Sequence, residues 1–544
     1  MNVSIVRACI FCVVVGLLAG CGGGISHNSP PAGSAVSVEV SGTSPFSSIC
    51  GMAVPTGTTE TFTAGSAVQP QIAAIPNGNL VGVWEQDRWS GVGARGILTS
   101  YSADGGATWK AAQTLQFSAC GGGSGPGASY DRASDPWVSF AGNGVVVASA
   151  LAFSANGFTG KGFGTTGAPS AVLAARSTDG GVTWASATAV WVDANSGAAP
   201  FYFNDRDSIT ANPSTGDVYL VWDRLASDTT LSVPAYLATL ASGSSTWVAR
   251  VLYDPGVSSG SGNEAFNNQI VILPNGTVLD FFTLLSLSNF SGTGTLQVIS
   301  SSNKGSTWSA PSTVASITSA GTTDPITQGV IRDSPLMAQV AVDPVSGALA
   351  AVWQQVFNGN AAFDGIALSI STNNGATWST PKQINGAPTF AAFDPTVRYL
   401  QSGVIAVTYY DFRDFVSGST VLSTSAWLTE SNDNGATWHE LRLQSPFDLK
   451  QAPLADFNKG TALFLGDNQG LALVSGNALP FYAATNSAGA HIYATQSPSP
   501  LSSPTAHVYS SIRAGPVSAA ATARARALVE QRLRMRGSTG PGLP

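Results

Sequence analysis

The chain has 544 residues, of which only 10% are charged, and its formal net charge is −7 at pH 7. It is long enough to bury a sizeable core, and its 60 glycines and 9% aromatic residues are more typical of a β-rich extracytoplasmic protein than of a helical cytosolic enzyme. The lack of a broad basic footprint argues against nucleic acid as a partner.

The first 21 residues have the pattern of a secretion signal. Arg7 precedes an apolar run from Ala8 to Leu18, which is too short for a mature membrane-spanning helix and suits a signal peptide. The run ends in Leu18-Ala-Gly-Cys21, which resembles a bacterial lipobox. We therefore expect lipidation at Cys21 and a place in the bacterial envelope, at the outer membrane or cell surface. Ordinary signal cleavage with an incidental cysteine is the alternative. Residues 22–35 are expected to be a flexible tether.

Two cysteines remain after the signal peptide and the lipid anchor are set aside, Cys50 and Cys120. An even pair in an oxidising compartment predicts a disulfide between them. In the chain-entropy model, closing such a loop contributes at most about 4 kcal/mol. Cys9-Ile-Phe-Cys12 lies in the signal peptide and is expected to leave with it. The rest of the sequence contains no Cys-x-x-Cys or Cys/His cluster, so we expect no metal site and no cofactor.

Residues 36–498 are expected to form the folded domain, and they begin with a strand. Val36-Ser-Val-Glu-Val40 alternates as a half-buried strand should. Seven hairpin patterns follow, each a short turn before an apolar run, as in Pro76-Asn-Gly-Asn-Leu-Val-Gly-Val-Trp84. The last hairpin is followed only by His491-Ile-Tyr-Ala494, so we expect residues 36–40 to pair there and supply its missing strand.

Five copies of one octet, Ser-x-Asp/Asn-x-Gly-x-Thr-Trp, recur between these hairpins. The copies begin at Ser102, Ser177, Ser301, Ser371 and Ser431, and a shortened sixth runs from Ser242 to Trp247. Recurrence at this spacing predicts a repeat architecture. Asp or Asn before Gly is turn chemistry, and Trp offers apolar surface to bury. Because five equivalent copies cannot line one active site, we expect structural roles for Asp104, Asp179, Asn303, Asn373 and Asp433.

The octet resembles the Asp box, or BNR repeat, of the sialidase superfamily, and the resemblance extends over about residues 68–498. It implies a β-propeller with the octets on its rim, away from the active site. The expected fold class is therefore all-β, a single β-propeller. The repeat count favours seven blades, whereas the family favours six.

Residues 499–544 differ in character from the rest of the chain. Residues 497–504 are rich in Pro and Ser, and residues 519–536 are rich in Ala and Arg and could be helical. This basic tail could contact anionic lipid, but a solvated, partly disordered extension is the simpler expectation.

Charged residues gather just before or after the first hairpin of each repeat. If the repeats form a ring, they should cluster at one end of its central channel. The predicted cluster comprises Arg132, Asp135, Arg206, Asp207, Arg332, Asp333, Asp394, Arg398 and Asp467. One interpretation is buried Arg–Asp pairs that join neighbouring blades. The other is a polar funnel that binds an anionic or sugar ligand, since the Arg fork grips a carboxylate at two points.

The resemblance to sialidases implies three arginines on the substrate carboxylate, a Tyr nucleophile activated by a Glu, and an Asp acid. Arg132, Arg206, Arg332 and Arg398 are candidates for the arginine clamp. Tyr410, or Tyr409, is the candidate nucleophile, Asp135 or Asp87 the acid, and Glu264 or Glu85 the partner of the Tyr. The Phe/Tyr-Arg-Ile-Pro motif of sialidases is absent, so no catalytic assignment rests on a matched motif.

Three functions remain open on this sequence. The chain could be a surface glycoside hydrolase of sialidase type, or a non-catalytic propeller that binds glycan or protein at the cell surface. A different glycosidase or a lyase is the third possibility. In each case we expect a monomer whose partner is a glycan, possibly a carboxylated sugar, or a protein. Arginines converging on one point beside a Tyr–Glu contact would favour the hydrolase, and arginines paired with aspartates would favour the binder.

Overall fold

The structure is a computed structural model. It describes residues 35–47, 50, 60–154, 158–159, 162–163, 169–195, 200–228, 230–258, 260–287, 292–357, 363–457, 460–499, 501 and 507–508. Within these ranges the regular elements are β-strands and a few short 3-10 helices. No helix in this part of the chain has the length and apolarity needed to cross a membrane.

Most strands fall into antiparallel units of four, and we name each unit by its first and last strands. The units comprise β2 (Phe62–Ala74), β3 (Leu80–Trp89), β4 (Ala94–Ser102) and β5 (Gln113–Thr114); β6 (Arg132–Gly142), β7 (Val145–Phe153), β10 (Ser170–Ser177) and β11 (Thr188–Asp193); β12 (Tyr202–Ala211), β13 (Val218–Ala226), β14 (Ala235–Leu240) and β15 (Val248–Tyr253); β17 (Ser261–Ile272), β18 (Val278–Ser286), β19 (Thr293–Ser301) and β20 (Ser312–Thr318); β22 (Gln339–Val342), β23 (Leu349–Gln355), β24 (Gly365–Ser371) and β25 (Lys382–Gln383); and β26 (Ala392–Tyr399), β27 (Ile405–Asp411), β28 (Ser423–Ser431) and β29 (Thr437–Arg442).

The last unit takes strands from both ends of the folded region. It contains β33 (Gly470–Val474), β34 (Asn477–Asn486) and β35 (Gly489–Gln496), and β1 (Val36–Glu39) pairs with β35. The pairing is antiparallel and runs from Val36 opposite Gln496 to Glu39 opposite Tyr493. The pairing predicted for this N-terminal strand is therefore confirmed.

Smaller elements connect or extend the units. They are β8 (Phe158–Thr159), β9 (Gly162–Phe163), β16 (Val257–Ser258), β21 (Ile331–Arg332), β30 (Phe447–Asp448), β31 (Leu454–Phe457), β32 (Gly460–Phe464) and β36 (His507–Val508), with 3-10 turns at Ala119–Gly121, Pro126–Ser129, Gln401–Gly403 and Leu449–Gln451. β21 pairs in parallel with β32, which brings the connection before β22 against the connection before β33.

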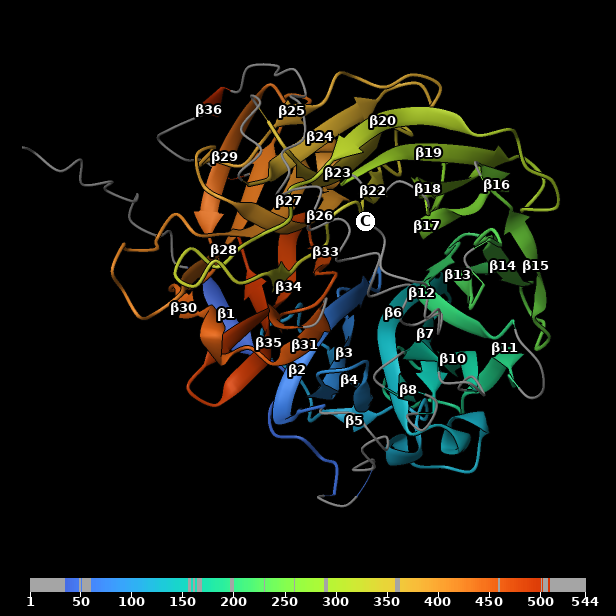
Figure 1. Cartoon of the computed structure of the whole chain (residues 1–544). Helices are drawn as coiled ribbons and strands as arrows, with labels where there is room; N and C mark the ends of the chain where they lie inside the picture. The colour runs from blue at the N-terminus through green and yellow to red at the C-terminus, as the bar shows by residue number, and fades with distance from the viewer. Residues whose placement is uncertain are drawn as a thin grey trace, which may run out of the picture.

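The units lie around a common centre, with their first strands innermost (Figure 1). β2 contacts β6, and the contacts continue through β12, β17, β22, β26 and β33 back to β2. The later strands of each unit lie toward the outside, as β15, β20 and β29 show (Figure 1). This all-β arrangement is of the β-propeller type.

Most of the innermost strands share a bulge with a left-handed residue. Register shifts occur between Val68 and Gln71 in β2, and at the corresponding places in β6, β12, β17 and β26. The residues with positive φ at these bulges are Gln69, Asp135, Arg206, Asn267 and Asp394, with φ between 50° and 60°. A bulge re-aims a side chain, so polar side chains are held in equivalent places around the centre.

Side chains link neighbouring first strands, which do not pair with one another as a sheet. Ser208 Oγ donates to the Asn268 carbonyl at 2.9 Å. Gln269 accepts from the Val340 amide at 2.9 Å and donates to the Val340 carbonyl at 3.2 Å. Gln469 donates to the Asp394 carbonyl at 2.7 Å. These bonds satisfy backbone groups that no ladder reaches.

The octets form the same turn in each unit that carries one. In the copy at Ser177, Gly181 N donates to Ser177 Oγ at 2.8 Å and Thr183 N donates to Asp179 Oδ1 at 2.9 Å. Asn373 accepts from the Thr377 amide at 2.9 Å in the same way. The Thr108 hydroxyl and amide bonds hold the pKa of the exposed Asp104 at about 2. The octet aspartates are therefore turn residues.

Each octet glycine lies against the preceding unit. A Cβ on Gly181 would lie 2.4 Å from Val81 of the β2–β5 unit, and one on Gly106 would lie 2.4 Å from Leu479 of the β33–β35 unit. The expectation of buried octet tryptophans is only partly met, because Trp438 is 0% exposed whereas Trp109, Trp184, Trp308 and Trp378 are half-buried.

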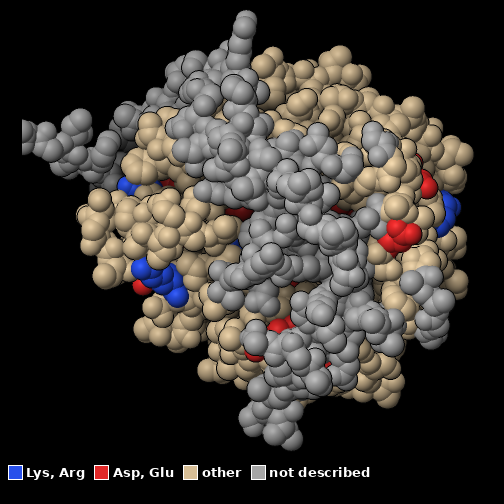
Figure 2. Space-filling model, viewed as in Figure 1, with Lys and Arg blue, Asp and Glu red and all other residues tan. Residues whose placement is uncertain are grey.

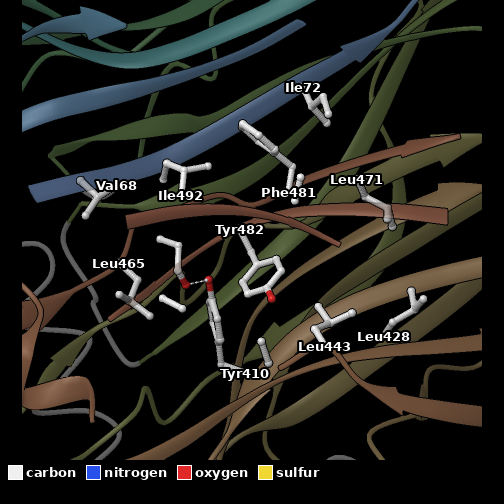
Figure 3. Packing of buried hydrophobic residues seen from close by; sticks show 14 of the residues in the cluster. Val68, Ile72, Tyr410, Leu428, Leu443, Leu465, Leu471, Phe481, Tyr482 and Ile492 are labelled. Carbon is white, nitrogen blue, oxygen red and sulfur yellow. Dashed lines mark hydrogen bonds between the residues drawn. The ribbon is translucent and has the colours of Figure 1, made fainter. Parts of the chain in front are cut away.

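The core fills the spaces between units. Figure 3 shows one such region, where Phe481 and Tyr482 of β34 pack near Val68 and Ile72 of β2 and Leu428 of β28. The inner and middle strands are almost wholly buried, as in β3 and β27. The rigid inner strands position the charged side chains described next.

Candidate functional site

Two of the predicted clamp arginines converge on one aspartate. Arg206 Nη1 lies 2.6 Å from Asp467 Oδ2, and Arg332 Nη2 lies 2.9 Å from the same oxygen. All three residues are buried. Burial acts to raise the pKa of Asp467, but the two arginines hold it well below its usual range. Asp467 is therefore an ionised counter-ion for both.

The backbone explains this convergence. Arg206 is the left-handed bulge residue of β12. Arg332 ends β21 opposite Phe464 of β32, three residues before Asp467. The guanidinium of Arg332 lies 4.6 Å from the centre of the Phe464 ring, and that of Arg88 lies 4.5 Å from it. The parallel β21–β32 contact thus brings Arg332 and Asp467 together.

Asp135 lies near Arg206 and contacts a further carboxylate, Glu85. Asp135 accepts from Gln69 Nε2 at 2.9 Å, and its amide donates to Glu85 Oε1 at 3.3 Å. Glu85 Oε2 pairs with Arg88 at 2.5 Å. Burial raises the pKa of Glu85 to about 7. The charge of Arg88 opposes this rise, and the charge of Asp135 adds to it. Burial also raises the pKa of Asp135, against Arg206. We call Glu85, Asp135, Arg206, Arg332 and Asp467 the central cluster.

Other predicted members lie at the edge of this cluster and bind amides or hydroxyls. Asp333 Oδ2 accepts from Gln354 Nε2 at 2.8 Å, and the Asp394 amide donates to Gln354 Oε1 at 3.2 Å. Burial raises the pKa of Asp394 well above its usual value, and the nearby charges of Asp333 and Asp467 add to this. Burial likewise raises the pKa of Asp207. Neutral acids at these places avoid the cost of burying unpaired charge.

Arg132 does not join the central cluster. Its guanidinium donates to Glu60 Oε2 at 2.6 Å and to the Val92 carbonyl at 3.0 Å, and it lies over the Trp89 ring. The side chain is 0% exposed. Arg132 therefore anchors the segment that enters β2, and its predicted place in the clamp is wrong.

Arg398 is also separate from the other arginines. It lies near the end of β26, whereas Asp394 lies near the beginning. Its side chain is exposed, and within the described ranges it forms no ion pair. The sequence analysis predicted Arg398 at the start of its strand. Because β26 already begins at Ala392, Arg398 lies near the other end of the strand.

Tyr410 is a core residue and not an available nucleophile. Its hydroxyl donates to the Ala483 carbonyl at 2.6 Å, and the residue lies within the buried cluster of Figure 3. Its ring packs against Phe393 and Phe447. Burial raises the pKa of Tyr410 well above its usual value. Glu264 is buried in β17 of another unit. The structure does not bring Tyr410 and Glu264 together.

The alternative nucleophile, Tyr409, does contact a glutamate, but away from the central cluster. Its hydroxyl bonds to Glu440 Oε1 and accepts from Arg413 Nη2 at 2.9 Å. Arg413 also pairs with Glu440 at 2.8 Å and with Asp411 at 2.5 Å. Tyr409 is 0% exposed. Glu440 belongs to β29, the outer strand of its unit, so this group joins strands within the protein.

The alternative acid, Asp87, is engaged by local donors. It accepts from Ser44 Oγ at 2.9 Å, the Gly65 amide at 2.9 Å and Arg95 Nη1 at 3.3 Å. Cys50 and Cys120 are joined by a disulfide near this segment, with Cα atoms 5.6 Å apart. Cys21 lies outside the described residues. Asp87 thus holds the N-terminal segment on the β2–β5 unit.

Sequence reasoning missed the residues that support the cluster. Gln69, Gln354 and Phe464 set the positions of Asp135, Asp394 and Arg332, but no charge or spacing singled them out.

Within the described ranges, no group of three metal-ligating side chains occurs. Among the described residues visible in Figure 2, charged side chains are few and scattered.

The residues that decide the family are the repeats themselves. Residues 216–482 match the family model of the BNR repeat-like domain. The chain therefore contains a BNR repeat-like domain. This confirms the resemblance to the Asp-box repeats of the sialidase superfamily that the octets indicated. No curated protein matches this chain.

Several solved structures are similar to this chain. The Hadza microbial sialidase Hz136 is 16% identical over 80% of this chain and 66% of that one, with a TM-score of 0.40. A protein of unknown function from Dyadobacter fermentans is 12% identical over 80% and 97%, with a TM-score of 0.41. The α-L-arabinofuranosidase of Fusarium graminearum is 12% identical over 85% and 97%, with a TM-score of 0.40.

Proposed function

We propose that this protein is a sialidase-like propeller that recognises a glycan or protein at the bacterial envelope without hydrolysing it. The observation that carries the proposal is the occupation of Arg206 and Arg332 by Asp467. Their charge is already compensated by a buried internal carboxylate. A substrate carboxylate would have to displace Asp467, which would leave a buried anion without its partners.

The tyrosines support the same conclusion. Sialidase-type hydrolysis needs a tyrosine whose hydroxyl can reach the sugar. The Tyr410 hydroxyl donates to a backbone carbonyl, and the Tyr409 hydroxyl is held by Glu440 and Arg413. Both side chains are buried. Of the two functions that the sequence left most open, recognition without catalysis has the better support.

We propose that the recognition domain is a closed ring of seven blades. The four-stranded units, the cyclic contacts of their first strands and the entry of β1 into the last unit support this count. A closed ring leaves no unit with an open inner edge. The expected state in solution is a monomer.

We further propose that the protein is anchored to the envelope through lipid on Cys21, because Leu18-Ala-Gly-Cys21 and the tether behind it fit a lipoprotein. Cys21→Ser should leave the protein unprocessed or release it from the membrane fraction. Membrane fractionation with metabolic lipid labelling tests this. A Cys21→Ser protein that fractionates and migrates like wild type would refute the anchor.

The decisive experiment on function is turnover of a fluorogenic sialoside by protein lacking residues 1–21. We expect no turnover above background, and no preference for sialic acid over a neutral sugar at the central cluster. Arg332→Ala and Lys382→Ala form a matched pair, since Lys382 lies on the outer strand β25. Turnover that Arg332→Ala abolishes and Lys382→Ala retains would establish the hydrolase instead.

A further inference from the structure

The segment that follows the third strand of a unit normally fills the groove against the preceding unit. In five units this segment is the octet, and its serine is buried, as at Ser102 and Ser431. The glycine of the octet then reaches the preceding unit: a Cβ on Gly435 would lie 3.1 Å from Leu368 and 3.3 Å from Ile370. Two units lack a full octet, and in them other residues lie between the unit and its predecessor.

In the β33–β35 unit, residues 497–499 and Leu501 take the place of the octet. Ser499 N donates to Asn477 Oδ1 at 3.0 Å, and Ser499 Oγ donates to Glu430 Oε1 at 2.5 Å. Leu501 N donates to Glu430 Oε2 at 2.8 Å, and its side chain joins the core. Glu430 immediately precedes the octet serine Ser431, as Ile370 precedes Ser371 in its own unit. This groove therefore contains an apolar side chain beside a satisfied charge.

In the β12–β15 unit, the shortened octet leaves the groove unfilled. Ser242 N donates to Asp217 Oδ1 at 3.1 Å, the same bond that Ser499 makes with Asn477. By this register Ser244 corresponds to Leu501 and to the glycine of a full octet, so a small polar residue stands here where Leu501 stands in the other groove. Ser242 lies at the position of the octet Asp, because Val218 pairs with Leu240 as Leu80 pairs with Ser102, and like Asp104 it is exposed. A pocket of about 230 Å³ remains between this unit and the β6–β11 unit.

This pocket presents a cation, polar groups of the surrounding turns and a smaller apolar surface. Val145, Val147, Val218 and Leu240 supply apolar surface, and Arg176 stands among them. Arg176 precedes the octet serine Ser177, so it holds the position that Glu430 holds in the filled groove. Its side chain is exposed and forms no ion pair within the described part of the chain.

We propose that this pocket binds the carboxyl-terminal residue of a polypeptide, with an apolar side chain on the apolar surface and the α-carboxylate on Arg176. The filled groove shows both components, an apolar residue and a charge satisfied beside it. Because the charge here is a cation, the ligand must bring the acceptor. The Arg fork suits a carboxylate, and the pocket volume suits one residue. The inference does not depend on the central cluster.

The probe is N-acetyl-leucine, followed by saturation-transfer NMR and calorimetry against protein lacking residues 1–21. We expect a dissociation constant in the millimolar range, as suits so small a ligand. N-acetyl-leucinamide, which lacks the charge, should bind at least about ten-fold more weakly. N-acetylneuraminic acid, a polar carboxylate, should not compete, which separates this site from a sialic acid site.

Two variants and a control locate the site. Arg176→Gln should weaken N-acetyl-leucine binding at least about ten-fold, while Lys110→Gln, an exposed cation elsewhere, should change nothing. Ser244→Leu imitates Leu501 and should abolish binding while keeping or raising the melting temperature. Equal binding of the acid and the amide, no effect of Arg176→Gln, or no binding to wild type would each overturn the proposal.

Discussion

Arg206 and Asp467 form a buried ion pair at 2.6 Å, although 261 positions separate them in the chain. Arg332 shares the same carboxylate oxygen at 2.9 Å. The three residues come from β12, β21 and the connection after β32, so one carboxylate joins three distant parts of the fold. The cluster is therefore first of all a structural centre.

Removing this carboxylate should be costly. Asp467→Ala leaves two buried guanidinium groups uncompensated, and we expect a loss of about 3–5 kcal/mol in the free energy of unfolding. Urea denaturation measures it. Acetate should restore part of the loss in the variant and none in wild type, because the anion can occupy the vacated position.

Lys304 provides the control for that prediction. It pairs with Asp217 at 2.8 Å but is 67% exposed. An exposed pair contributes at most about 1 kcal/mol, so Lys304→Ala should unfold nearly as wild type does. Similar losses for the two variants would show that Asp467 is not a buried counter-ion.

The stability of the protein should fall as pH rises from about 5 to 8, and Glu85 should account for part of the fall. Its pKa is about 7 in the folded state, above the ordinary value of 4.5, because burial disfavours the charged form. The folded state therefore binds more protons than the unfolded state between these values, and stability declines as pH rises through them.

Glu85→Gln should remove up to about 3 kcal/mol of this decline, at 1.36 kcal/mol per pKa unit. Urea denaturation of both proteins at pH 5, 6, 7 and 8 gives the two slopes. Asp364 and Asp411, whose pKa values burial raises to about 6, will leave a residual slope in the variant. Identical slopes for variant and wild type would contradict the assignment.

The octet aspartates should tolerate asparagine. Asn373 accepts from the Thr377 amide at 2.9 Å, as Asp179 accepts from the Thr183 amide at 2.9 Å. The Asn373 amide also donates to the Thr377 hydroxyl, whereas the Thr183 hydroxyl donates to Asp179. We expect Asp179→Asn to change stability by less than about 0.5 kcal/mol and Asp179→Ala to cost about 1–2 kcal/mol. Thermal unfolding compares them. Equal effects of the two substitutions would mean that the side-chain bonds contribute little.

The octet tryptophans should differ in importance according to burial. Trp438→Ala removes a fully buried ring and should cost about 3–5 kcal/mol. Trp184→Ala should cost clearly less, since its ring is half-buried. Denaturant unfolding of the two variants tests the order, and a larger loss for Trp184→Ala would reverse it.

Deleting the first strand should destabilise the last unit. A protein that begins at residue 42 lacks β1 and the bond from the Val40 amide to the Ile492 carbonyl, and β35 becomes an open edge. We expect a loss of about 3–5 kcal/mol, from hydrogen bonds and the buried Val40 side chain. A protein that begins at residue 35 is the control. Equal melting temperatures would show that β1 is dispensable.

The repeats made much of the fold predictable from sequence. Five octets and seven hairpin patterns predicted the antiparallel units. The alternation of Val36–Val40 predicted a strand, and the missing strand of the last hairpin predicted that it pairs beside β35. Local turn chemistry is enough for such elements, because Asp or Asn before Gly forms the same turn wherever it occurs.

The site was less predictable because position along a strand is not position in space. Asp467 was expected in the cluster. Its role as counter-ion depends on the β21–β32 contact, which no sequence pattern predicts. Arg398 was wrongly grouped because β26 begins at Ala392 and carries it away from Asp394. Tyr409 and Tyr410 are adjacent in a strand, so they point to opposite faces, and both faces of β27 are buried.

The pairing of Val36 with Gln496 has a consequence for how the chain matures. During synthesis the amino-terminal strand emerges first, but its partner β35 is made only near the end of the described part of the chain. The earlier units can assemble from neighbouring segments, whereas the final sheet must wait for nearly the whole polypeptide. Long-range pairing of this kind slows folding. Chains truncated before β35 should therefore retain an exposed strand that proteases and chaperones can recognise, so completion of the last sheet serves as a check that the polypeptide is whole.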